Sequence, residues 1–344
     1  MTSPEQEVRS LTFEELKLHR LAGQHLLQPT DTQTVVKNLC GVQAQYLSHA
    51  LHGLSIRCDK ADPTGLVKSW TNRGTMHLFS EDDLPLFLYQ GRTIKLRPVD
   101  TMASDAYLSA ARKAYFADLI LNAVASGTDE RETLKTVCES KGMTETEAES
   151  IFNPWGGLLR ALCEEGKLCH NVQEKKSFRL CPAFEPMDQE TAQRELLRRY
   201  FTHFGPATVK DAAYFFGWPH SRIKSLMKAM AAESFCLDNR VYYHTDCQLP
   251  AQDVPHCLFL AGFDQLMLGY EKGENPFLPQ VHMRKIFSTA GIVRPAILVD
   301  GQVAGFWNLK NRKLSVTFFE EVDKDLLAEA AGNLWPDLKC ITFE

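Results

Sequence analysis

The order of hydrophobic and polar positions along the 344-residue chain repeats three times. In each stretch, segments with apolar residues at helical spacing are followed by two short runs in which apolar and polar residues alternate. The clearest copy covers residues 189–245. Gly205 and Pro206 end its first predicted helix, and Thr208 caps the second. The alternating run SFCLDNRVYYH then predicts a β-hairpin that turns at Asp238 and Asn239.

This order of elements is typical of the winged-helix form of the helix-turn-helix. It also fits residues 110–183, where KLCHNV and SFRLC form the predicted hairpin, and more loosely residues 10–100. Residues 246–344 differ, and their hairpin at 293–308 turns at an Asp-Gly pair. We therefore predict a helix-rich α+β fold with three tandem winged helices around a concave cleft and a C-terminal α+β region.

Composition then narrows the class of protein. With 44% hydrophobic and 24% charged residues, the chain is neither disordered nor fibrous. No apolar run reaches the roughly 18 residues of a membrane span, and the first 20 residues lack the apolar segment of a signal peptide. The ten cysteines include no Cys-x-x-Cys pair. We expect a soluble intracellular protein with reduced thiols, without metal, other cofactor or membrane partner.

The formal net charge of −5 is unevenly distributed. Residues 194–228 carry seven basic side chains against two acidic ones, and residues 279–313 carry six against one. Residues 129–149 and 317–344 have the opposite excess. A negative total is therefore compatible with a basic surface that binds DNA. The alternative is that these basic side chains only keep helix surfaces soluble.

The usual catalytic motifs, such as a Ser-His-Asp set, a metal-ligand cluster or a phosphate loop, are not recognisable. One short feature remains. In LCGVQAQYLSHALHG, two amide side chains, Gln43 and Gln45, are separated by Ala44. The spacing alone is weakly specific, and on spacing alone amides that cap nearby backbone groups are the better explanation.

The residues around this pair resemble a known family. LTFEELKLHRLAGQHLL, VVKNLCGVQAQYLSHALHGLSIR and the segment Trp70–Phe79 look like the first winged helix of the AlkZ/YcaQ-like DNA glycosylases of bacteria. FGPATVKDAAYFFGW resembles the third winged helix of that family, and LAGFDQLMLGY, His282-Met283-Arg284 and GIVRPAILVDGQVAGFWN resemble its C-terminal region. The resemblance covers residues 10–310, with the middle winged helix its least distinctive part.

The catalytic motif of the family is Gln, an aliphatic residue, then Gln or Asp. The resemblance thus assigns catalysis to Gln43 and Gln45, with Ala44 smaller than the usual aliphatic residue. It implies a metal-independent, monofunctional glycosylase that acts on alkylated purines in double-stranded DNA. We expect a monomer in the bacterial cytoplasm, associated with the nucleoid when DNA is bound. Whether interstrand crosslinks are substrates stays open.

Such chemistry suits a pair of amides. A purine alkylated at N7 already carries positive charge, so it can leave without protonation. Two fixed amide dipoles can then orient a water and stabilise an oxocarbenium-like sugar. The chemistry would be narrow, because neutral bases would not be released.

Further residues are expected to contact DNA at predicted wings, helix starts and hairpins: Arg73, His77, Arg222, Lys224, His282, Arg284, Lys285, Lys310 and Arg312. The two histidines are also explained as buried structural residues. Two other functions remain: a non-enzymatic winged-helix regulator or damage-binding protein, and a protein-interaction scaffold. A regulator would bind DNA in a salt-dependent manner without releasing a base.

Overall fold

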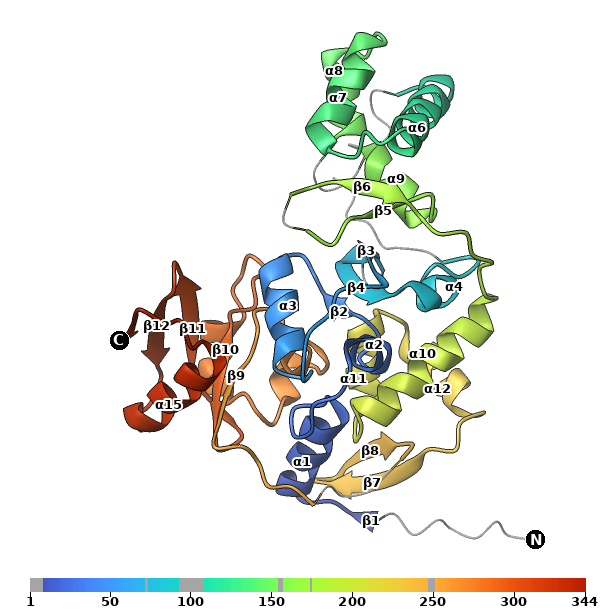
Figure 1. Ribbon diagram of the computed structural model, residues 1–344. Coiled ribbons are helices and arrows are strands. Elements are labelled where there is room, and N and C mark those ends of the chain that lie inside the picture. Colours follow the sequence, from blue (N-terminus) through green and yellow to red (C-terminus); the bar gives the residue numbers. More distant parts are fainter. Residues whose placement is uncertain (1–8, 72–73, 93–107, 154–156, 174, 247–250) are drawn as a thin grey trace, which may run out of the picture. The chain divides into compact units, whose positions relative to one another are not determined.

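The computed structural model describes residues 9–71, 74–92, 108–153, 157–173, 175–246 and 251–344. These residues form an α+β fold, as the sequence predicts, and the strands make three sheets (Figure 1). The chain divides into two compact units: unit 1 comprises residues 1–62 and 194–344, and unit 2 comprises residues 63–193. The division into segments 10–100, 110–183, 189–245 and 246–344 stays a prediction.

Unit 1 begins with three helices and a short strand, α1 (Phe13–Gly23), α2 (Thr32–Asn38), β2 (Val42–Gln43) and α3 (Leu47–Ser55). Helix α1 begins with a capping box, in which Thr12 and Glu15 bond each other's backbone N–H groups. Asp31 caps α2 in a similar way, by accepting the Thr34 N–H.

The next part of unit 1 follows the predicted order of helix, helix, helix and hairpin. The elements are α10 (Gln189–His203, in unit 1 from Arg194), α11 (Val209–Phe216), α12 (His220–Met227), β7 (Glu233–Leu237) and β8 (Arg240–His244). Thr208 caps α11, and Asp238 and Asn239 turn the hairpin with φ of 48° and 59°. β1 (Arg9–Ser10) adds a parallel strand beside β7.

The C-terminal part of unit 1 is a five-stranded sheet in the order β13-β12-β11-β10-β9. The strands and helices of this C-terminal part are β9 (Cys257–Phe259), α13 (Gln265–Leu268), α14 (Met283–Ile286), β10 (Ala296–Val299), β11 (Gln302–Lys310), β12 (Lys313–Phe318), α15 (Lys324–Leu334) and β13 (Cys340–Phe343). Asp300 and Gly301 turn β10 into β11 at φ of 46° and 72°. Leu327 and Ala331 of α15, four residues apart, pack in the same core as Trp307.

Unit 2 contains four antiparallel strands in the order β4-β3-β5-β6. The strands and helices are β3 (Leu66–Trp70), β4 (Met76–Ser80), α4 (Leu84–Phe87), α6 (Ala110–Ala125), α7 (Arg131–Ser140), α8 (Glu145–Ile151), α9 (Gly157–Glu164), β5 (Leu168–His170) and β6 (Phe178–Leu180). Lys68 pairs with His170, so the wings predicted for two different segments share one sheet. Phe116, Ile120 and Leu134 lie at the centre of its core.

No helix within the described ranges is long and apolar enough to cross a membrane. Every cysteine that the structure describes is a free thiol, and five of them are buried.

Candidate active site around Gln43 and Gln45

A tight turn after α2 sets the position of the amide pair. Cys40 and Gly41 adopt left-handed conformations, with φ of 52° and 78°. The Gly41 N–H donates to the Val36 carbonyl at 2.8 Å and the Cys40 N–H to the Lys37 carbonyl at 3.3 Å, the two bonds of a Schellman motif. Glycine adopts such a φ without steric cost. The turn therefore fixes where β2 begins, with Gln43 as its second residue.

The segment 260–265 supports this turn from a distant part of the sequence. Gln265 is only 2% exposed and donates from Nε2 to the Gly41 carbonyl at 3.0 Å, across 224 residues of sequence. Asp264 begins α13 and accepts the Leu266 N–H at 2.9 Å. A third amide thus holds the backbone two residues before Gln43.

A buried ion pair fixes the same segment. Two nitrogens of Arg57 donate to the two carboxylate oxygens of Asp264, at 2.7 and 3.0 Å. Arg57 also donates to the carbonyls of Gln24 and Gly53. Neither side chain is more than 2% exposed. Loss of either partner would leave an uncompensated buried charge, which costs about 3–5 kcal/mol of stability.

Gln43 and Gln45 lie in different environments. Gln43 is 6% exposed and lines a small hollow of about 10 Å³ together with His49, Arg57 and residues 261–265. Gln45 is exposed, and Ala44 between them is fully buried. The Gln43 amide is buried among these residues, so charge that develops nearby would interact with its dipole with little intervening water. Gln45 is open to a substrate in solvent.

Aromatic side chains border the exposed amide. Tyr46 is 47% exposed, and its ring stacks on Phe263 with centroids 5.6 Å apart and an interplanar angle of 24°. The His49 ring meets the Tyr46 ring edge-on at 6.1 Å. Burial lowers the pKa of His49, so this imidazole is neutral at pH 7. The site therefore combines neutral amides, aromatic rings and the Arg57–Asp264 ion pair, in which the two charges neutralise each other.

Comparison with known proteins assigns the chain to a family. A model of the DNA glycosylase AlkZ-like family matches residues 36–334. The chain belongs to this family. An interstrand DNA cross-link repair glycosylase of Streptomyces sahachiroi is 28% identical over 324 residues, covering 84% of this chain and 85% of that protein. The solved structure of S. sahachiroi DNA glycosylase AlkZ matches with a TM-score of 0.76 at 22% identity, over 98% of this chain and 100% of that one.

Family membership implies a DNA substrate, and six of the basic residues expected to contact it belong to unit 1. Arg222 and Lys224 lie on α12, Arg284 and Lys285 on α14, and Lys310 and Arg312 beside the turn between β11 and β12. All except the half-buried Arg222 are exposed. Their contact with DNA stays a prediction.

The other three residues expected at DNA have different surroundings. His77 is 2% exposed and bonded to the Thr71 hydroxyl at 2.7 Å. His282 is 5% exposed and bonded to Glu320 at 3.0 Å. Such burial favours the structural interpretation of both histidines over a phosphate contact. Arg73 lies outside the described residues.

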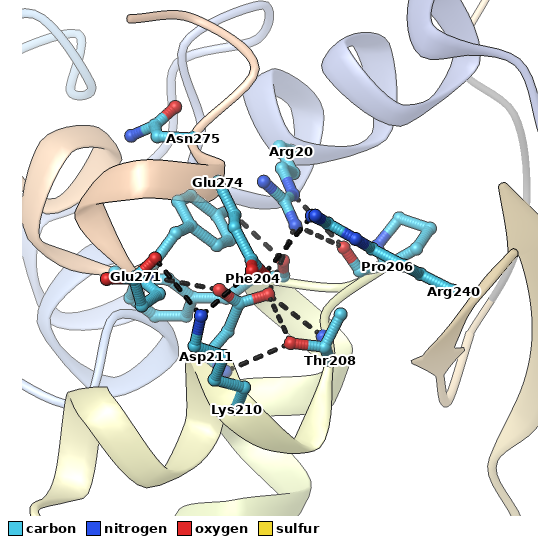
Figure 2. Close-up of polar contacts among 12 residues, drawn as sticks. Arg20, Phe204, Pro206, Thr208, Lys210, Asp211, Arg240, Glu271, Glu274 and Asn275 are labelled. Carbon is cyan, nitrogen blue, oxygen red and sulfur yellow. Dashed lines mark hydrogen bonds and ion pairs between the residues drawn. The ribbon is translucent and has the colours of Figure 1, made fainter. Parts of the chain in front are cut away.

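Ion pairing reduces the basic character of segment 194–228 in this AlkZ-like protein. Figure 2 shows Lys210 beside Glu274, where it donates at 2.8 Å, and Glu271, at 3.5 Å. Arg240 pairs with Glu274 at 3.3 Å. Because both glutamates lie outside the segment, its sequence charge overstates the positive surface that it presents.

Figure 2 also shows a buried polar group at the start of α11. Arg20, 1% exposed, donates twice to the Pro206 carbonyl and lies 3.6 Å from Asp211. Asp211 accepts the Glu271 N–H at 2.9 Å. These contacts connect α1, α11 and the segment after α13 within unit 1. They therefore stabilise the part of the fold in which the amide pair lies.

Sequence reasoning missed the roles of Arg57, Asp264 and Gln265. Arg57 ends the apolar run LHGLSIR, and Asp264 interrupts the apolar run LAGFDQLML. Opposite charges isolated in two apolar runs are a signal for a buried pair, because neither charge is stable there alone. Among the described residues, no cluster of three or more His, Cys, Asp or Glu side chains could hold a metal ion.

Proposed function

We propose that the protein hydrolyses the N-glycosidic bond of cationic N7-alkylpurines in double-stranded DNA, as a monofunctional, metal-independent glycosylase. The observation that carries this proposal is the pairing of a buried amide, Gln43, with an exposed amide, Gln45, in a segment whose backbone at Gly41 is held by Gln265. Family membership and the glycosylase activity named for its relative support it.

In the proposed reaction the amides act through their dipoles. A neutral amide has no useful pKa, so neither glutamine serves as a general base. The alkylated purine leaves as a neutral base because it carries positive charge before the bond breaks. Gln45 orients the attacking water, and the carbonyl oxygen of Gln43 stabilises the oxocarbenium-like deoxyribose. A neutral base, which needs protonation to leave, is spared.

The small size of the hollow agrees with a substrate base that stays outside it. It holds about 10 Å³, room for about one water, far below the roughly 300–1,000 Å³ of typical ligand pockets. An interstrand crosslink cannot flip fully out of the duplex into a pocket. We propose that the adduct stays outside the hollow, beside the exposed Gln45, and that N7-linked crosslinks are a second substrate class. The name of the S. sahachiroi relative supports this extension.

The test is a single-turnover assay on duplexes with one 7-methylguanine, one N7-linked crosslink, or one neutral lesion such as uracil. We expect free 7-methylguanine and an unhooked crosslink, and no release of uracil. Release of none of these bases, with lesion-dependent and salt-sensitive binding, would favour the damage-binding alternative. Gln90→Ala serves as the control for an exposed glutamine outside the site, and we expect full activity from it.

A further inference from the structure

The aromatic ring of Tyr46 lies directly beside the exposed amide. Tyr46 follows Gln45 in the sequence and is the residue before α3 begins. A ring 47% exposed at this point is unusual, since large aromatic side chains are mostly buried. Any substrate that reaches Gln45 therefore passes close to an aromatic surface.

The ring is held in place by its neighbours. Phe263 stacks on it and is itself 6% exposed, with a φ of 58° that is rare for a bulky residue. A side chain at Gly262 would place its Cβ 2.9 Å from the His49 ring, so glycine lets the imidazole lie against this segment. Strained backbone of this kind persists where surrounding contacts enforce it, often at functional sites.

The electrostatics beside the ring suit a cation. The basic side chains that line the adjoining hollow are His49 and Arg57. Burial lowers the pKa of His49 and leaves it neutral, and Arg57 is matched by Asp264. A positively charged group that approaches the ring would therefore meet an aromatic face, and the side chains of that lining would not repel it. Such a face attracts cations through its quadrupole.

We propose that the Tyr46 ring, supported by Phe263 and His49, binds the positively charged face of the N7-alkylated base and so determines specificity for cationic lesions. The inference rests on the proposed function and deepens it. The positive charge of the base then contributes to specificity in two steps. The ring recognises it on binding, and the same charge allows the base to leave when the bond breaks. Shape recognition in a deep pocket is not needed, so alkyl groups of different size are accepted.

The experiment compares binding to two duplexes of the same shape. One carries 2′-fluorinated 7-methylguanosine, which is cationic and resists hydrolysis. The other carries 7-deaza-7-methylguanine, its neutral isostere. We expect the wild-type protein to bind the cationic duplex about tenfold more tightly. Tyr46→Leu should remove this preference, and Tyr46→Phe should retain it. Tyr115→Leu, at another exposed tyrosine, is the matched control with the preference intact.

Either of two results would overturn the inference: no charge preference in the wild type, or an undiminished preference in Tyr46→Leu. Release of 7-methylguanine by the wild-type protein is measured alongside. Its absence refutes the proposed function, whereas release with an unchanged preference in Tyr46→Leu refutes only the role of the ring. Thermal unfolding checks that the variants are folded, and Tyr46→Gln provides the same test if the leucine variant is not.

Discussion

Two hollows, one in each unit, differ in size and in lining. The hollow of unit 1 that Gln43 lines holds about 10 Å³, and His49 and the Arg57–Asp264 pair also line it. A hollow of unit 2 is larger, about 310 Å³, and Arg92, Glu164 and Glu165 contribute to its lining. Volume alone would select neither, because a third hollow, in unit 1, holds about 490 Å³ and is lined by Glu320, Glu321 and Asp325 among others. The polyanionic backbone of DNA disfavours the carboxylates of both larger hollows, so side-chain chemistry selects the first.

The arginines of the two hollows illustrate the difference. Arg57 neutralises a buried carboxylate that belongs to the segment supporting Gln43. Arg92 donates to the backbone carbonyls of Trp70 and Glu164, at 3.0 and 2.8 Å, and so holds the local fold of unit 2. The first hollow places neutral dipoles on a rigid support, as stabilisation of a developing charge requires. The second is interpreted as structural.

The largest expected effect is on glycosylase activity, which should depend on the residues of the first hollow and not on those of the second. Gln43→Ala should lower the rate of 7-methylguanine release at least about a hundredfold, because loss of one preorganised dipole at a developing charge typically costs that much. Gln45→Ala should have an effect of similar size. Glu165→Gln, an exposed change in the second hollow, should leave the rate unchanged. Comparable losses at Glu165 and Gln43 would reverse the assignment.

A buried and an exposed ion pair should differ next. Asp264→Ala leaves Arg57 buried and unpaired, so we expect a loss of about 3–5 kcal/mol in the free energy of unfolding. Glu139→Ala removes the partner of Lys135 in an exposed pair of unit 2, with an expected loss below about 1 kcal/mol. Denaturant unfolding measures both losses. Equal values would show that the buried Arg57–Asp264 pair contributes no more to stability than an exposed pair does.

A smaller effect tests how the amide loop is held. Gln265→Leu removes the donor to the Gly41 carbonyl, and we expect kcat to fall about tenfold with little change in the affinity for DNA. Gln265→Glu should be similarly impaired at pH 7.5, where an ionised carboxylate repels that carbonyl.

The pH profile of Gln265→Glu distinguishes positioning from general damage. Burial raises the pKa of the introduced carboxyl, so lowering the pH towards 5.5 protonates it and restores a donor. The activity of this variant should therefore rise as pH falls, relative to the wild-type protein, whose catalytic amides do not titrate. A parallel profile for Gln265→Leu and Gln265→Glu would contradict the positioning role.

The smallest effect concerns the basic residues outside the hollows. Arg284→Ala, at an exposed site on α14, should lower the slope of log affinity against log salt by about one unit. Lys210→Ala should leave the slope unchanged, because Glu271 and Glu274 already neutralise this lysine. Equal slopes for the two variants would remove α14 from the proposed DNA surface.

Local features of the fold were predictable from sequence, and long-range contacts were not. Asp238-Asn239 and Asp300-Gly301 mark hairpins because few residues other than Gly, Asn and Asp accept positive φ, and Thr208 marks a helix start for an equally local reason. β13 pairs in parallel with β12 at the end of the chain, and short-range pattern carries no sign of that partner.

The same limit applies to the site. Gln43 and Gln45 were found because they are adjacent in sequence and resemble a family motif. Gln265 and Asp264 act across more than two hundred residues, and each alone looks like an ordinary polar residue in an apolar run. Likewise, the pairing of Lys210 with Glu274 is invisible to a count of charges along one segment.

Chromatography of the released base under single-turnover conditions tests whether the two neutral amides break the N-glycosidic bond of a cationic purine. With a 7-methylguanine duplex, we expect free 7-methylguanine from the wild-type protein and background release from Gln43→Ala/Gln45→Ala, with DNA binding retained in the double variant. Release by the double variant at the wild-type rate would refute the catalytic role of the amides.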